Sequence, residues 1–220
     1  MTVPPPDDCR RVLVAANPCS GRRSNCGPVE RLLDALRGEG LAPVAVWDSA
    51  ERARLLRRET WRAVVVAAGD GTVNDVINEG VSAPLAALPL GTENLFARRF
   101  GCGHDVRRLA RALAHLVVRP LDAGEVIRPG ERRRFVLMLS AGVDAEIVRR
   151  LAEARGSGRA TGRGGYVAYL RPTLGAAAAY RWPRLRVEAD DVIAEGTHLL
   201  VFNVDAYALG LSYAPDARDD

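Results

Sequence analysis

The sequence predicts an α/β protein in which a three-layer domain with a parallel sheet is followed by a β-rich domain. In the first half, short apolar runs alternate with segments whose apolar residues recur at helical spacing, which is typical of a parallel sheet covered by helices on both faces. After about residue 118, short strand-like runs dominate. We therefore expect a disordered lead-in over residues 1–9, an α/β domain over residues 10–118 and a β-rich domain over residues 119–220.

Four strands are expected in the first domain, at residues 11–16, 43–47, 63–68 and 85–88. The run AVVVAA at residues 63–68 is apolar throughout, as in a strand that is buried on both faces. Helices are expected between and after the strands, at residues 29–39, 50–59, 72–80, 94–100 and 106–116. Gly40 suits the end of the first helix, and Ser49 is the expected N-cap of the second.

The second half is predicted to mix strands with two helices. The expected strands lie at residues 121–127, 135–140, 185–188 and 198–204. The expected helices lie at residues 144–154 and 166–180, with a glycine-containing mobile loop at residues 155–165 between them.

Composition excludes several classes of protein. All 31 residues of the Lys and Arg type are arginine, and a Walker A loop needs a lysine on the phosphates, so the chain is not a P-loop NTPase. A net charge of +4 is too small to indicate nucleic-acid binding. The four cysteines form no C-x-x-C pair, so no metal–thiolate or disulfide role is assigned. Since no apolar run is long enough to span a bilayer and no signal pattern opens the chain, we expect a cytoplasmic protein without a transmembrane segment.

Three of the expected strands end in loops suited to binding phosphate. They are NPCSG at residues 17–21, GDGT at residues 69–72 and PLGTEN at residues 89–94. Ligands of parallel α/β sheets bind beyond the carboxyl ends of the strands, and glycines let backbone N–H groups approach a polyphosphate. Each loop leads toward a helix N-terminus, which favours an anion, and Asp70 could hold Mg²⁺ or meet an acceptor hydroxyl. Each loop alone is also compatible with a plain turn or helix start, but their joint occurrence predicts a polyphosphate site.

These runs resemble the catalytic domain of diacylglycerol kinases and of the related bacterial lipid kinases, sphingosine kinases and ceramide kinases. The pattern of that family is N-P-x-[SA]-G, then G-G-D-G-T-x-N-[ED]-V-x-N-G, then P-x-G-T-x-N-D-[FL]-A-R. This chain has NPCSG, then AGDGTVNDVINEG at residues 68–80, then PLGTENLFAR at residues 89–98. Weaker matches are DAG at residues 122–124, SAGVDA at residues 140–145 and FN at residues 202–203.

The resemblance implies a first domain like those of phosphofructokinase and NAD kinase, followed by a β-sandwich. It implies ATP and Mg²⁺ as cofactors, a lipid hydroxyl delivered from a membrane surface as acceptor, and a phosphate monoester as product. By the same resemblance Asp70 is the catalytic candidate in this chain, and the metal candidates are Asp70, Asp219 and Asp220. The nucleotide would be bound by Asn17, Ser20, Gly21, Gly69, Asp70, Gly71, Thr72, Asn74, Gly91, Thr92 and Asn94.

The chain departs from the family pattern at three places. Ala68 stands where the family usually has its first glycine, a mild change if the backbone there has a negative φ. Leu95 stands where most members carry an aspartate of the magnesium network, and Glu93, two residues earlier, is a weak substitute. The sequence also stops at Asp220, inside a segment that resembles the family's P-x-A-x-x-D-D-G. The family's proposed general base lies in a later motif, so we expect an incomplete β-rich domain and weak or absent transfer.

Two other functions remain open from the sequence. An NAD kinase shares the GDGT run, although the GTENLFA run at residues 91–97 favours the lipid kinases. A nucleotide-binding module with impaired chemistry would also keep the three loops. The sequence does not name the lipid acceptor, and it leaves open whether the protein is a homodimer.

Overall fold

The computed structural model of the chain describes residues 9–18, 25–101, 103–156, 175, 180–189, 192–205 and 214–217. The expected lead-in therefore lies outside the described residues except for its last one. The chain forms two compact units, one made of Met1–Leu137 with Asn203–Asp220 and the other of Met138–Phe202. The predicted domain boundary near residue 118 remains a prediction.

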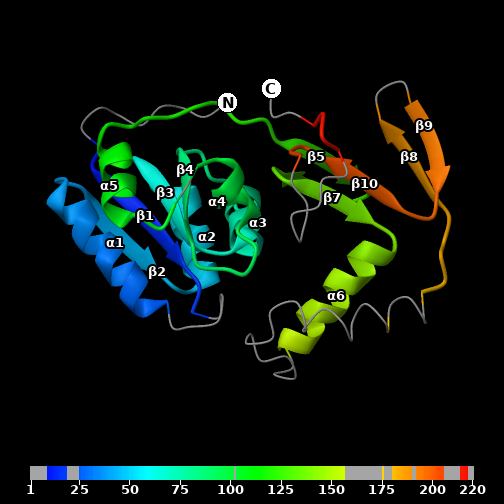
Figure 1. Cartoon of the computed structure of the whole chain (residues 1–220), viewed down its shortest axis with the longest axis horizontal. Coiled ribbons are helices and arrows are strands. Elements are labelled where there is room, and N and C mark those ends of the chain that lie inside the picture. The colour runs from blue at the N-terminus through cyan, green and yellow to red at the C-terminus, as the bar shows by residue number, and fades with distance from the viewer. Residues whose placement is uncertain are drawn as a thin grey trace. The chain divides into compact units, whose positions relative to one another are not determined.

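A four-stranded parallel sheet forms the centre of the first unit (Figure 1). Its strands are β1 (Arg11–Ala16), β2 (Ala42–Val46), β3 (Ala63–Ala68) and β4 (Leu85–Pro89), and their order across the sheet is β2-β1-β3-β4. All three pairings are parallel. The four predicted strands are confirmed to within one residue at each end.

Helices cover both faces of this sheet. Leu13 and Val64 point to one face and pack against apolar residues of α2 (Ser49–Arg58), α3 (Asp70–Asn78) and α4 (Leu95–Arg99). Val14 and Val65 point to the other face and pack against α1 (Cys26–Gly38) and α5 (Val106–Ala114). Because side chains alternate along a strand, one continuous apolar run serves both layers. The predicted three-layer α/β architecture is confirmed.

Two helix starts differ from the expectation. Asp48, not Ser49, caps α2: its backbone is extended and its side chain accepts a hydrogen bond of 2.8 Å from Glu51 N, so Ser49 is already the first helical residue. Helix α3 begins at Asp70, two residues before the predicted start, because Gly69 is the extended N-cap. The GDGT run is therefore largely the first turn of α3 rather than a loop before it.

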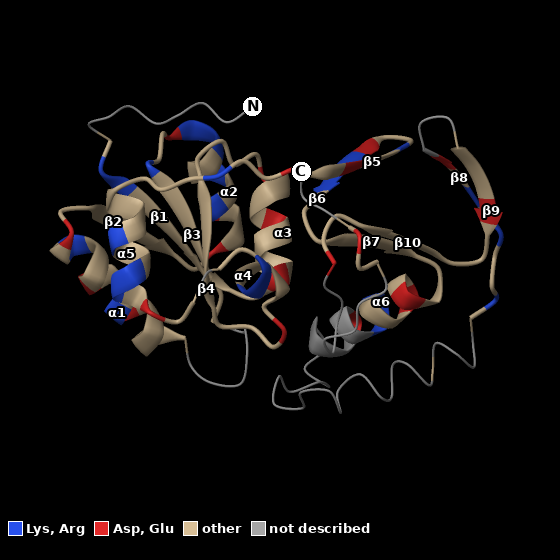
Figure 2. Cartoon of the chain, turned by 45° about the horizontal axis from the view of Figure 1, so that its top comes forward, with Lys and Arg blue, Asp and Glu red and all other residues tan. Residues whose placement is uncertain are grey.

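An antiparallel hairpin of β5 (Gly124–Arg128) and β6 (Glu131–Phe135) also belongs to the first unit. Its turn contains Gly130 at φ 77, a conformation that glycine adopts without strain. Both strands carry arginine and glutamate residues, coloured blue and red in Figure 2, and Arg132 and Arg133 form ion pairs with Glu125 and Glu131. Strand β6 was not predicted as such, because the run ERRRF lacks the apolar alternation that marks a half-buried strand.

Asparagine side chains attach this hairpin to the rest of the unit. Asn78, the last residue of α3, donates to the carbonyl of Arg134 at 3.0 Å and accepts from its N–H at 2.9 Å. Asn203 donates to the carbonyl of Asp122 at 2.8 Å and to that of Val136 at 3.2 Å. An amide side chain can thus pair with backbone in the way a neighbouring strand would.

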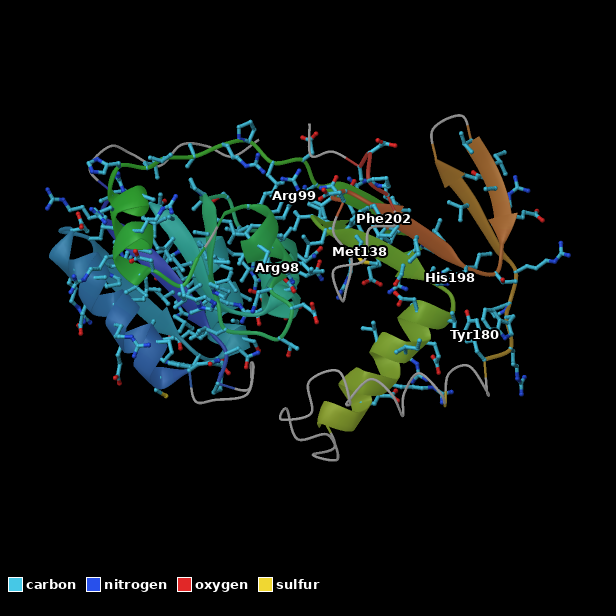
Figure 3. The ribbon with its side chains drawn as sticks, in the orientation of Figure 1. Arg98, Arg99, Met138, Tyr180, His198 and Phe202 are labelled. Atoms are coloured by element: carbon cyan, nitrogen blue, oxygen red, sulfur yellow. The ribbon has the colours of Figure 1, made fainter. Side chains whose placement is uncertain are left out.

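The second unit contains an antiparallel pair, β7 (Met138–Ala141) with β10 (Leu199–Phe202), in which Met138 lies opposite Phe202 (Figure 3). Helix α6 (Val143–Gly156) follows β7, which confirms the helix predicted there; its last two residues replace the expected start of the loop at residues 155–165.

A hairpin of β8 (Leu185–Ala189) and β9 (Val192–Gly196) completes the described part of this unit. The rest of the predicted loop at residues 155–165, and most of the helix predicted at residues 166–180, lie outside the described residues. No helix in the described parts of the chain is long and apolar enough to cross a membrane.

Candidate functional site

The order of the strands brings the predicted phosphate loops to one edge of the sheet. The chain passes from β1 to β2 on one side and then crosses to β3 on the other side of β1. Ligands of α/β sheets bind at such a switch point, beyond the carboxyl ends of the strands. The loop after β4 joins the same edge, since β4 pairs with β3 and Leu90 N donates to the carbonyl of Ala68 at 3.0 Å.

A side-chain hydrogen bond crosses the switch point. Asn17 Nδ2, directly after β1, donates to Thr72 Oγ1 in the first turn of α3 at 3.4 Å. Asn25, which is 4% exposed, donates to the carbonyl of Asn17 at 2.6 Å and so fixes the end of β1. The structure therefore brings the predicted Asn17 and Thr72 together. Asn25 was not predicted, because its partner is a backbone atom eight residues away.

Two predicted positions, 69 and 91, require glycine because their backbones touch each other. A Cβ added to Gly91 would lie 2.5 Å from Gly69 Cα, and a Cβ added to Gly69 would lie 3.1 Å from Gly91 Cα. The loops after β3 and β4 thus touch through their backbones. A Cβ added to Gly71, in contrast, would have no described atom within 4 Å. Packing among the described residues gives no reason for glycine at position 71.

Asp70 joins the same two loops through its carboxylate. Its Oδ2 accepts from Leu95 N and its Oδ1 accepts from Phe96 N, both at 3.0 Å. These N–H groups open α4 and have no partner inside that helix, so Asp70 caps it from a distant point of the chain. The sequence did not predict this structural role. Among the described residues each oxygen accepts one hydrogen bond, which leaves it a further lone pair. The catalytic and metal roles of Asp70 stay predictions.

Asn94 shapes the loop before α4. Its backbone lies in the left-handed region, at φ 51 and ψ 47, which asparagine tolerates better than most residues. Its side-chain Oδ1 accepts from Gly91 N at 2.8 Å, and its Nδ2 donates to the carbonyl of Gly91 at 3.0 Å. Both ends of the amide are thus used to close the loop around Gly91, and the nucleotide-binding role of Asn94 stays a prediction.

The remaining predicted residues fall into two groups. Asn74 lies half-buried on α3, where its carbonyl accepts from Asn78 at 2.8 Å, and Thr92 is exposed in the loop after β4. Four predicted residues lie outside the described residues: Ser20, Gly21, Asp219 and Asp220.

The departures at residues 68 and 95 have local explanations. Ala68 is the last residue of β3 and has no positive φ, so the fold accommodates its methyl group. Leu95 is buried at the start of α4 and offers Asp70 its N–H instead of a carboxylate.

Glu93, which the sequence suggested as a weak substitute for the family's aspartate, has a side chain that is 13% exposed. Its Oε1 is buried and has no hydrogen-bond partner among the described residues. Among all the described residues, no group of three or more His, Cys, Asp or Glu side chains is placed to hold a metal ion.

The strand order and the loops beyond the strand ends give the chain the architecture of α/β proteins with a switch point in a parallel sheet. Residues 11–126, just over half of the chain, match the family described as "Diacylglycerol kinase catalytic domain". The chain belongs to this family, which confirms the resemblance seen in its motifs.

Curated relatives support the same membership. A diacylglycerol kinase of Bacillus subtilis is 29% identical over 128 residues, which is 53% of this chain and 42% of the relative. A protein of Salmonella newport named "Probable lipid kinase YegS" is 27% identical over 139 residues, or 58% of this chain and 46% of the relative. The matches thus span less than half the length of these relatives.

Solved structures share the fold. A diacylglycerol kinase of Bacillus anthracis superposes with a TM-score of 0.63 at 18% identity, covering 97% of this chain and 71% of that one. A putative diacylglycerol kinase of the same organism gives a TM-score of 0.67 at 19% identity, covering 96% of this chain and 72% of the other.

Proposed function

We propose that this chain is the nucleotide-binding part of an ATP-dependent lipid kinase that forms a phosphate monoester on a lipid hydroxyl. The observation that carries the proposal is the open start of α3 at Gly71, in a chain of the diacylglycerol kinase family. The acceptor would be a diacylglycerol-like lipid, reached from the cytoplasm at a membrane surface. Assembly as a homodimer stays a prediction.

The start of α3 has the properties of a phosphate site. No described side chain caps it. Thr72 N–H donates to the carbonyl of Gly69 at 3.0 Å, so the N–H groups of Asp70 and Gly71 are the ones that would meet an anion. Gly71 would let a phosphate approach this turn closely, because it has no side chain and no described atom fills the space beside it. The Gly69–Gly91 contact fixes the position of the turn, and Asn17 and Thr72 flank it.

The same residues are compatible with a nucleotide that carries Mg²⁺. When bound, the ion would neutralise charge on the phosphates. Asp70 would hold it with the lone pairs that its bonds to α4 leave free, and Asp219 and Asp220 remain the other predicted ligands. The residues of this chain would bind and orient the phosphates through the first turn of α3.

Calorimetry and a transfer assay test the proposal together. ATP with Mg²⁺ should bind the parent chain, and Asp70→Asn should weaken binding, while the exposed control Glu30→Gln should not. Labelled γ-phosphate is then offered with diacylglycerol in mixed micelles and, separately, with NAD. Transfer to diacylglycerol is expected to be weak or absent, and any label that appears should be on diacylglycerol rather than on NAD. Label on NAD alone would favour an NAD kinase, and ATP binding without any transfer in a chain extended past Asp220 would favour a nucleotide-binding module. A parent chain that binds no ATP would refute the proposal.

A further inference from the structure

Glu93 is a buried carboxylate whose charge the described residues do not balance. Its side chain is 13% exposed, and its Oε1 is buried without a hydrogen-bond partner in the described part of the chain. Among the described residues, the cation in contact is Arg98 on α4 (Figure 3), whose Nη1 lies 3.9 Å from the other oxygen, Oε2. The Arg98 side chain is 63% exposed. A long contact to an exposed arginine stabilises little, whereas an unsatisfied buried carboxylate is costly. Folding alone therefore gives no reason for glutamate here.

The loop that carries Glu93 is fixed on both sides. Before it, Gly91 touches Gly69 and is closed by the Asn94 amide. After it, Leu95 donates its N–H to Asp70. The polar groups of Gly91, Asn94 and Leu95 are thus used in internal contacts, whereas Oε1 of Glu93 has no hydrogen-bond partner among the described residues.

The loop that carries Glu93 adjoins the start of α3, where we propose that the phosphates bind. Residues 17–21, 69–72 and 89–94 contain two carboxylates, Asp70 and Glu93. The Asp70 oxygens each accept an N–H from α4, whereas Glu93 Oε1 accepts nothing from the described residues. The loop of Glu93 touches Gly69, directly before the open turn at Gly71.

We propose that Glu93 is an oxygen ligand of the divalent cation that accompanies the bound nucleotide. The inference rests on the proposed function, because the phosphates would supply further ligands. Hard cations such as Mg²⁺ prefer carboxylate oxygens, and in nucleotide sites Mg²⁺ uses one or two carboxylates together with phosphates. Such a site needs no cluster of three protein ligands, in keeping with the described residues. A cation at Oε1 would also balance the buried charge.

The test compares Glu93→Gln, which keeps the shape and removes the charge, with Glu30→Gln on the exposed surface of α1. ATP affinity is measured by calorimetry with Mg²⁺ and with EDTA. Binding of Mn²⁺ in the presence of ATP is followed by electron paramagnetic resonance. We expect Glu93→Gln to lower the affinity for the cation by about tenfold or more while ATP in EDTA binds as before. Without ligand, Glu93→Gln should melt about 2–4 °C higher, because the unbalanced charge is gone.

The outcomes separate the two proposals. If the parent chain binds ATP with Mg²⁺ and Glu93→Gln shows the same cation dependence, the inference about Glu93 is overturned and the proposed function stands. If the parent chain binds no ATP, both are overturned. Should Glu93→Gln fail to fold, Glu93→Asp keeps the charge on a shorter stem. It is expected to weaken cation binding by about threefold or more, and an unchanged affinity in that variant would overturn the inference as well.

Discussion

Replacing Gly71 with alanine tests whether glycine is needed there for packing of the chain or for the approach of a bound phosphate. A Cβ at this position has no described atom within 4 Å, and Gly71 has no positive φ. The methyl group should therefore fit the folded chain. Because alanine restricts the unfolded chain and favours helix, the free energy of unfolding should rise by up to about 1 kcal/mol.

That gain corresponds to a melting temperature higher by about 1–4 °C in a chain of this size. The same methyl group would occupy the space through which we propose that the phosphates approach α3. Affinity for ATP should accordingly fall by about tenfold or more, or about 1.4 kcal/mol. A variant that is more stable and binds ATP less tightly cannot be explained by damage to the fold.

Gly91→Ala is the matched comparison. Its Cβ would lie 2.5 Å from Gly69 Cα and 2.8 Å from Asn94 Oδ1, so the two loops must move apart. Overpacking of this kind costs about 1–3 kcal/mol, and the melting temperature should fall by about 2–12 °C. Thermal melts followed by circular dichroism and calorimetry with ATP measure both effects. Wild-type ATP affinity in Gly71→Ala would refute the placement of the phosphates, and wild-type stability in Gly91→Ala would refute the packing argument.

Three further variants test the account. Asp70→Asn removes one acceptor from the start of α4 and should cost about 1–2 kcal/mol in urea denaturation; an unchanged midpoint would contradict the capping role. Asn78→Ala removes both bonds to the Arg134 backbone, so amide exchange should speed up in β5 and β6 but not in the parallel sheet. Equal exchange rates in Asn78→Ala and in the parent chain would contradict this attachment. Hydrogen bonds from Arg149 and Arg150 lower the pKa of Glu146 from 4.5 to about 2. The ionised form is thus favoured in the fold, and its stabilisation, present above pH 4.5, should be lost as the pH falls toward 2. Glu146→Gln should remove this acid-induced loss of helicity, as followed by far-UV circular dichroism, and the loss should shrink in high salt; a loss that persists in Glu146→Gln would contradict the assignment.

Local sequence patterns predicted much of the first unit. Runs such as AVVVAA at residues 63–68 identify buried strands because both faces of the sheet are covered, and the order of strands and glycine loops then places residues 17, 69–72 and 89–94 at one edge. Strands β6 and β9 were missed because their exposed residues carry no apolar alternation: β6 reads ERRRF, and every residue of β9 is exposed.

Long-range contacts explain what the sequence could not predict at the site. Asp70 bonds to N–H groups 25 and 26 residues away, and the Gly69–Gly91 contact depends on two loops meeting in space. The partners of buried arginines could not be predicted for the same reason. Arg52 is 5% exposed and bonds through two nitrogens to both carboxylate oxygens of Glu79, 27 residues later, although its sequence context resembles a solvated face. Such partners are set by the fold, not by neighbouring residues.

Hydrogen–deuterium exchange of the parent chain with and without Mg-ATP tests the central claim, that a nucleotide binds at the switch point of the sheet. We predict slower exchange at the amides of residues 69–73 and 90–94, because the first turn of α3 and the loop after β4 would be covered. Exchange that stays unchanged there would contradict the claim. So would protection confined to the distant hollow between α1 and α5, which is lined by Arg31, Asp34, Arg107 and Arg111.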